Sequence, residues 1–193
     1  MGRVIIVTGI PGTGKTTVCN EVVKLAEQNG KKVEVINYGS VMVELSSKSG
    51  KPIHRDALRK SGLTFQHNLQ AEAAKIISKK AAKIQGDFIV DTHMSIKTVD
   101  GYLAGLPFHV LQHLNPELFI LVEAEPLEVL SRRFKDKTRK RDKVMEGEIA
   151  EEFLFSRLMA AACAVLTGAS VKIVKNPTGK QVLAAEEVLE LLV

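Results

Sequence analysis

Eight residues close to the N-terminus constrain this chain more than any other feature. Residues 9–16 read GIPGTGKT, match the pattern GxxxxGKS/T, and follow directly on the apolar run Arg3–Thr8. The glycines allow the backbone to turn its N–H groups inward, so that they can approach phosphate oxygens closely. A helix that starts at Lys15 adds the positive end of its dipole. We therefore expect a strand before this loop and a helix after it.

Each position of this loop has an expected role at a nucleoside-triphosphate site. The Lys15 ammonium should reach the β- and γ-phosphates, and the Thr16 hydroxyl should ligate Mg²⁺. The residues predicted to hold the nucleotide are Gly9, Ile10, Pro11, Gly12, Thr13, Gly14, Lys15, Thr16 and Thr17. The pattern does not name the phosphate acceptor, because GTPases, ATPases and many small-molecule kinases share it.

Strands and helices alternate along the rest of the chain. Short runs rich in β-branched residues predict strands at 3–8, 32–37, 87–91, 118–123 and 171–175. Helical patterns lie between and after them, at 15–29, 64–85, 125–133, 147–166 and 179–192. The alternation predicts one α/β domain over residues 1–193, with five parallel strands and helices on both faces. Ligands of such sheets lie beyond the carboxyl ends of the strands.

An acidic residue ends the third predicted strand. The run FIVDTH places Asp91 where a carboxylate would hold Mg²⁺ directly or through water, although a turn-capping aspartate is the alternative. His93 either contacts an acceptor nucleotide or packs near the site. We do not assign it as a base, because a phosphate acceptor is already an anion and catalysis then depends on positioning and charge neutralisation.

Basic residues concentrate in residues 132–143, which hold eight basic and two acidic side chains. Arginine forks match the oxygens of a phosphoryl group in transfer, so Arg132, Arg139 and Arg141 are catalytic candidates. A solvated basic surface is the alternative. Nucleic-acid binding is disfavoured, because Phe134 is the only aromatic residue in the run.

A second arginine pair, Arg55 and Arg59, lies between the second predicted strand and the long helix that follows. It is either a clamp for an acceptor phosphate or ordinary surface charge at helical spacing.

The composition fits a globular protein without a membrane segment. The 193 residues are 45% hydrophobic and 25% charged, with a net charge of +5. No apolar run approaches the ~18 residues of a membrane span or forms a signal-peptide core, so a cytoplasmic location is expected. Cys19 and Cys163 lie in predicted helices without CxxC spacing, which favours two buried thiols over a zinc site.

Motifs spread over nearly the whole chain resemble those of archaeal-type adenylate kinases. They are VTGIPGTGKTT (7–17), INYGSVM (36–42), RDALRK (55–60), VDTH (90–93), GYLAGLP (101–107), TRKRD (138–142) and LTGASVKIVKN (166–176). Together they are far more specific than the phosphate loop alone. The resemblance implies a P-loop kinase fold with a small helical AMP-binding region at about 38–85 and a short lid at about 134–147.

The resemblance also implies the reaction ATP + AMP ⇌ 2 ADP with Mg²⁺. It places AMP near Tyr38, Gly39, Arg59, Gln70, Asp91, Thr92 and His93. It makes Arg132, Arg139 and Arg141 the lid-side phosphate contacts and puts residues 176–179 near the ATP base. Similar proteins form trimers, so the resemblance implies a homo-oligomer.

Other functions stay open on the residues alone. A kinase for CMP or UMP would differ in base recognition. A nucleic-acid-associated ATPase would rest on the positive net charge. A regulatory GTPase would need a guanine-reading NKxD motif, which the sequence lacks.

Overall fold

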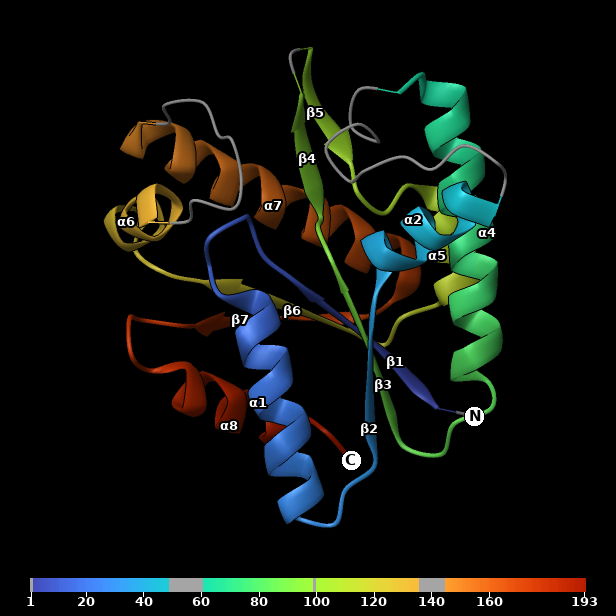
Figure 1. The fold of residues 1–193 in the computed structure, drawn as a ribbon, viewed down its shortest axis with the longest axis horizontal. Coiled ribbons are helices and arrows are strands. Elements are labelled where there is room, and N and C mark those ends of the chain that lie inside the picture. Colours follow the sequence, from blue (N-terminus) through green and yellow to red (C-terminus); the bar gives the residue numbers. More distant parts are fainter. Residues whose placement is uncertain (1, 49–60, 99, 136–144) are drawn as a thin grey trace.

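A computed structural model describes residues 2–48, 61–98, 100–135 and 145–193 (Figure 1). Its centre is a five-stranded parallel sheet in the order β2-β3-β1-β6-β7. The strands are β1 (Arg3–Thr8), β2 (Val33–Asn37), β3 (Asp87–Thr92), β6 (Leu118–Glu123) and β7 (Ser170–Lys175). The α/β prediction is confirmed, and every strand lies within one residue of its predicted bounds.

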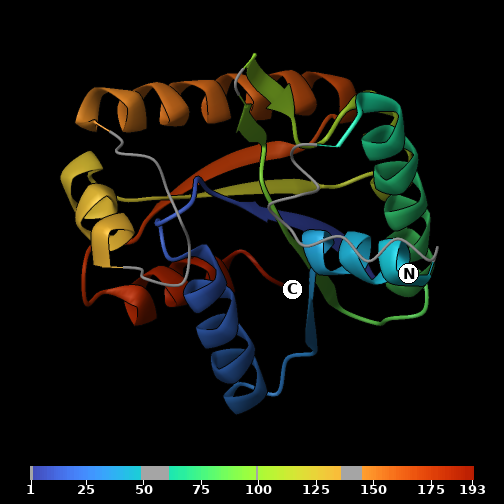
Figure 2. The same ribbon diagram turned by 45° about the horizontal axis from the view of Figure 1, so that its top comes forward.

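Helices cover both faces of this sheet, as Figures 1 and 2 show from two directions. One face carries α1 (Lys15–Gln28) and α8 (Gln181–Glu190), which pack against each other. The other carries α2 (Tyr38–Lys48), α4 (Leu63–Ala81), α5 (Phe108–Leu114) and α7 (Glu146–Thr167). Helix α6 (Pro126–Lys135), ten residues long, packs against α7.

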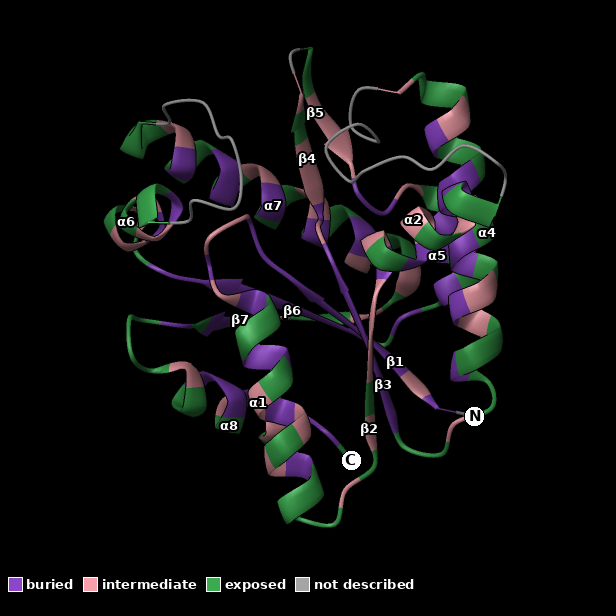
Figure 3. Ribbon diagram, viewed as in Figure 1, coloured by how far each residue is buried: buried purple, intermediate pink, exposed green. Residues whose placement is uncertain are grey.

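Side chains of the central strands alternate between two apolar clusters. In β1, Ile5 and Val7 face α1 and α8, whereas Val4 and Ile6 face the helices of the other layer. The alternation follows from the two-residue period of a strand. Because both of their faces are covered, β1, β3 and β6 are buried along almost their whole length, as Figure 3 shows, whereas the outer strands β2 and β7 are partly exposed.

Four elements are absent from the helices and strands predicted by periodicity. They are α2, which lies in the helical region expected from the resemblance at about 38–85, α5, and the antiparallel hairpin of β4 (Ser95–Thr98) and β5 (Gly101–Ala104). The hairpin projects from the edge of the sheet where β3 ends (Figure 1). It rests on α7, where the Tyr102 ring stacks on Phe155 with ring centroids 4.2 Å apart. Lys97 Nζ adds an ion pair to Glu148 of α7 at 2.6 Å.

Both cysteines are free and buried, as predicted. Burial raises the pKa of each thiol to about 11. For Cys19, the nearby positive charge of Lys15 lowers the pKa and so offsets part of this rise. Within the described residues, no helix is both long enough and apolar enough to cross a membrane.

The base of the hairpin requires a glycine. Gly105 donates its N–H to the Met94 carbonyl oxygen at 2.8 Å, which closes the hairpin next to the end of β3. A Cβ at this position would overlap the carbonyl oxygen of His93. The backbone segments of residues 93–94 and 105 can therefore lie this close only without a side chain between them.

We predict that Gly105→Ala lowers the free energy of unfolding by about 2 kcal/mol or more, because the added methyl forces the two segments apart. Gly147→Ala is the matched control, since a Cβ there meets no atom within 4 Å and the residue lies in α7. Urea unfolding followed by circular dichroism measures both. Equal stability of the two variants would contradict the close-approach argument.

Candidate functional site

The register of three parallel strands brings the phosphate loop and the acid together. Asp91 of β3 lies opposite Val7 of β1 on one side and Asn37 of β2 on the other. Ile89, two residues before Asp91, faces α1, so the period of the strand turns the Asp91 side chain to that same face. Asn37 follows Val35 in the same way. These side chains consequently meet the start of α1 at the carboxyl edge of the sheet.

The loop between β1 and α1 has the backbone that its glycines predict. Gly12 and Gly14 adopt φ values of 96° and 81°, in the left-handed region that glycine tolerates best. Thr13 is fully buried and donates its hydroxyl to the Ile10 carbonyl oxygen at 3.0 Å. Ile10 itself packs into a small apolar cluster with Phe153. The side chains of Ile10 and Thr13 therefore support the loop, and only their main-chain atoms are placed to meet a phosphate.

Asp91 is the centre of a polar cluster at the mouth of the loop. Its carboxylate forms an ion pair with Lys15 and accepts hydrogen bonds from Thr16 Oγ1 at 3.2 Å and Asn37 Nδ2 at 2.8 Å. Asp91 and Lys15 are buried, whereas Thr16 and its neighbour Thr17 are exposed at the start of α1. The structure thus unites the residues that the sequence assigned to triphosphate and Mg²⁺.

Asn37 is a site residue that the sequence reasoning missed. Its Oδ1 accepts the N–H of Ser40 at 3.0 Å, which leaves Nδ2 directed at Asp91. A polar residue at the end of the second predicted strand was the available signal, because the ends of neighbouring parallel strands share one edge of the sheet.

The donor set at this point fits Mg²⁺. The Thr16 hydroxyl and the Asp91 carboxylate are hard oxygen donors that already lie 3.2 Å apart. Mg²⁺ is typically held by one or two protein oxygens together with substrate phosphates and water. The exposure of Thr16 leaves room for those further ligands.

His93 lies against the start of the loop. Its Nδ1 is 2.8 Å from the Gly9 carbonyl oxygen, and because a carbonyl only accepts, Nδ1 carries the proton. Thr92 is buried. Two residues later, the Met94 N–H donates to Thr8 Oγ1 at 2.9 Å. Thr92 and His93 thus lie beside the end of β1, next to Thr8 and Gly9, and their contact with an acceptor stays a prediction.

The structure shows which part of Tyr38 could contact AMP. Its ring is buried in the core and its hydroxyl donates to the Gln70 carbonyl oxygen at 2.5 Å, which joins α2 to α4. Burial raises the pKa of the phenol, so the hydroxyl stays a donor. Its side chain is therefore structural, and contact with AMP would fall to the main chain or to the half-buried Gly39. Gln70 is buried too, and its predicted role at the adenine stays a prediction.

The two neighbouring arginines at the end of α6 have different surroundings. Arg132 donates to the carbonyl oxygens of Thr13 at 3.2 Å and Asn176 at 2.9 Å. Arg133 is buried, pairs with Glu152 and donates to a loop carbonyl. Both guanidinium groups thus bind main-chain carbonyls in this structure, and the contact of Arg132 with a phosphate stays a prediction.

The remaining predicted residues lie outside the described part of the chain. Arg59 and its neighbour Arg55 fall in residues 49–60, and Arg139 and Arg141 fall in residues 136–144. The bounds of the AMP-binding region and of the lid therefore stay predictions.

Comparison with known proteins agrees with this geometry. Residues 8–150 match a family model described as an AAA domain. The chain is 42% identical to the adenylate kinase of Methanocaldococcus jannaschii over 190 residues, which cover 98% of both chains. It is 44% identical to that of Methanopyrus kandleri over 191 residues, covering 98% of this chain and 97% of the other.

This chain belongs to the archaeal adenylate kinase family. Solved structures with much lower sequence identity share the fold of this adenylate kinase family member. Shikimate kinase from Acinetobacter baumannii superposes with a TM-score of 0.63 at 16% identity, covering 99% of this chain and 93% of that one. Shikimate kinase from Bacteroides thetaiotaomicron gives 0.59 at 13% identity, with 98% and 97% covered. At these identities the likeness confirms the P-loop kinase fold alone.

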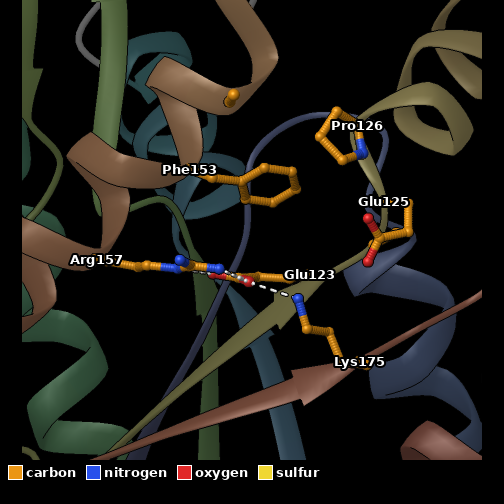
Figure 4. A pocket seen from close by; sticks show the side chains of 8 residues that line it. Glu123, Glu125, Pro126, Phe153, Arg157 and Lys175 are labelled. Atoms are coloured by element: carbon orange, nitrogen blue, oxygen red, sulfur yellow. Dashed lines mark hydrogen bonds and ion pairs between the residues drawn. The ribbon is translucent and has the colours of Figure 1, made fainter. Parts of the chain in front are cut away.

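A second charged cluster of this adenylate kinase family member lies at the end of β6 (Figure 4). The Glu123 carboxylate, 2% exposed, accepts from Arg157 Nε at 2.8 Å and Nη2 at 2.6 Å and from Lys175 Nζ at 3.2 Å. A pocket of about 170 Å³ lies beside it, lined also by Phe153 and Pro126. The cluster joins α7 and β7 to the strand that runs next to β1.

Two opposing effects act on the pKa of Glu123. Burial disfavours the charged form, but the hydrogen bonds and charges of Arg157 and Lys175 outweigh it, so the pKa is lowered from its usual 4.5. A carboxyl group with a lowered native pKa stabilises the fold above its unfolded pKa. That contribution is lost as the pH falls through the native value.

We predict that Glu123→Gln destabilises this adenylate kinase family member by about 1–3 kcal/mol at pH 7, because two cations lose their buried partner. The difference from the parent should shrink as the pH falls below about 4.5. Glu187→Gln is the control, since its pair with Lys172 is exposed and should contribute under about 1 kcal/mol. Urea unfolding at several pH values measures both, and a pH-independent difference would contradict the prediction.

Proposed function

We propose that this chain catalyses the Mg²⁺-dependent transfer of the terminal phosphoryl group of ATP to AMP, giving two ADP. The observation that carries the proposal is the meeting of Lys15, Thr16 and Asp91 at the end of a phosphate loop. Full-length identity of 41–44% to archaeal proteins named adenylate kinase supports the choice of acceptor.

On the donor side, the chain brings positive charge to a polyanion. The loop N–H groups, the α1 dipole and the Lys15 ammonium would offset the charge of the β- and γ-phosphates. Thr16 and Asp91 would hold Mg²⁺, which supplies charge neutralisation and a fixed orientation of the phosphates when bound. Lys15 forms its ion pair with Asp91 here, so a triphosphate in the loop would compete with that carboxylate for the ammonium.

On the acceptor side, AMP brings its own nucleophile. The bond between the γ-phosphorus of ATP and the β,γ-bridging oxygen breaks, and that oxygen leaves as part of ADP, while a phosphate oxygen of AMP forms the new bond to the phosphorus. No proton needs to be removed, so positioning and exclusion of water are what the protein contributes. We assign the grip on AMP to Arg59, with Gly39, Gln70, Thr92 and His93 beside it. Arg132, Arg139 and Arg141 would neutralise the group in transfer.

We expect AMP to be the best acceptor when ADP formation from ATP is measured with AMP, CMP, UMP and GMP in turn. The value of kcat/KM for AMP should exceed each of the others by about tenfold or more, because only the correct base satisfies the polar groups of the acceptor site. Chelation of Mg²⁺ should abolish turnover. A preference for CMP or UMP would replace the acceptor and leave the phosphate-loop assignment standing.

The Lys15→Ala variant tests the assignment of the phosphate loop in the same assay. Loss of the ammonium should lower kcat/KM by about 100-fold or more, or about 3 kcal/mol of transition-state stabilisation. Lys24→Ala is the matched control, since Lys24 is an exposed lysine of α1 that pairs with Glu21. Near-normal turnover of Lys15→Ala would remove the assignment of the loop.

We further propose that the protein works in the cytoplasm, where the adenine nucleotides that it would interconvert are made and used. Cell fractionation with an antibody to the chain tests this, and recovery in the membrane fraction would contradict it.

We propose a homo-oligomer as the working form, a trimer by resemblance to similar proteins. Support comes from apolar side chains exposed on α7 and on β7, the last strand of the sheet; they are Leu154, Leu158, Val165, Leu166, Val171 and Ile173. Exposed apolar side chains grouped in this way mark association surfaces in soluble proteins.

Light scattering at micromolar concentration should give a mass about three times that of the chain, and Leu158→Glu should reduce it to that of one chain by placing a charge in the interface. Lys180→Glu on the exposed start of α8 is the control. A parent that is monomeric under these conditions would exclude the oligomer.

A further inference from the structure

Two buried side chains hold the phosphate loop by its carbonyl groups. Arg133 of α6 donates Nε–H to the Pro11 carbonyl oxygen at 2.7 Å. Asn176, which follows β7, donates Nδ2–H to the Thr13 carbonyl oxygen, also at 2.7 Å. Arg133 is 9% exposed and Asn176 is 4% exposed, so both side chains are held largely away from solvent.

The planarity of the peptide bond converts these contacts into directions for two N–H groups. In a trans peptide the C=O and the following N–H point in opposite directions, and the described residues contain no cis peptide bond. The Pro11 carbonyl turned toward Arg133 therefore turns the N–H of Gly12 away from it. The Thr13 carbonyl turned toward Asn176 does the same for the N–H of Gly14.

We propose that Arg133 and Asn176 are positioning residues that keep the N–H groups of Gly12 and Gly14 directed at the triphosphate. They act from outside the loop and touch no phosphate themselves. The inference rests on the proposed function in one respect, that the loop is the triphosphate site, and it adds how the empty loop is held ready for the ligand.

The surroundings of Arg133 support a geometric role rather than an electrostatic one. Its guanidinium forms a two-pronged pair with Glu152 of α7, with Nη1–Oε1 at 3.0 Å and Nη2–Oε2 at 2.6 Å. The pair cancels the charge and fixes the plane of the fork, so that Nε has one direction left in which to donate. A Cβ added to Gly12 would lie 3.1 Å from Arg133 Cγ, which shows how closely the loop rests on this side chain.

Asn176 is fixed from both of its main-chain ends. Its N–H donates to the Glu123 carbonyl oxygen at 2.7 Å, and its own carbonyl oxygen accepts from Arg132 at 2.9 Å. A Cβ added to Gly14 would approach Asn176 Nδ2 to 2.5 Å. Each positioning residue thus lies against the glycine whose N–H it directs, which gives these two glycines a second reason to lack a side chain.

The probe for this inference is inorganic tripolyphosphate with Mg²⁺, which fills the loop without a base or a ribose. Arg133→Met combined with Glu152→Met removes the carbonyl contact without leaving a buried charge unpaired. Asn176→Leu independently removes the second contact, and it leaves on the Thr13 carbonyl only the longer hydrogen bond from Arg132 Nη1 at 3.2 Å. We expect each variant to raise the Kd of tripolyphosphate and of ATP about tenfold, with KM for AMP changed less than about twofold.

Arg3→Met is the matched control. It breaks an ion pair to a buried carboxylate, that of Asp87, but this pair lies at the opposite edge of the sheet from the phosphate loop. All proteins are compared at a temperature at which circular dichroism shows them folded. Unchanged tripolyphosphate affinity in a folded variant would overturn the inference, as would an equal loss in Arg3→Met, which would point to general destabilisation. Should either loop variant fail to fold, the other decides. Failure of the parent to bind tripolyphosphate would overturn the proposed function as well.

Discussion

The parallel register of β1 and β3 is the constraint on which the rest of the site depends. It sets Asp91 beside Val7, one residue before the strand ends, and so beside the phosphate loop. A slip of one residue would turn Asp91 to the opposite face of the sheet, away from Lys15 and Thr16. The slip is prevented by the apolar side chains that alternate into the two cores. Burial of the apolar side chains of the strands therefore fixes the position of Asp91 relative to Lys15 and Thr16.

Helix α7 organises the surroundings of the site through contacts with three other parts of the fold. Glu152 orients Arg133, Arg157 binds the buried carboxylate at the end of β6, and Phe155 carries the hairpin through Tyr102. These contacts reach the loop, the central sheet and the hairpin from one rigid element of 22 residues. Positioning groups precisely enough for phosphoryl transfer requires such support behind the residues that touch the ligand.

Much of the fold could be predicted because the central strands β1, β3 and β6 are largely apolar on both faces and the loop has a specific pattern. The sequence could not separate Arg132 from Arg133, since adjacent helical residues point about 100° apart and only tertiary packing decides which is buried. The position of Arg133 four residues after the buried Val129 was the available hint. Tyr38 was assigned to substrate by resemblance, but its ring is in the core. The hairpin strands, at four residues each, were too short for periodicity to reveal.

The state of the two cysteines has a practical consequence for spectroscopy on this protein. The thiolate is the form that attacks maleimides, and with pKa values of about 11 in buried positions both native thiols stay largely protonated and shielded at neutral pH. A cysteine introduced at an exposed position can therefore take a fluorophore selectively in the otherwise unaltered sequence. Dye pairs on α4 and on the hairpin would then follow the distance between these elements during turnover.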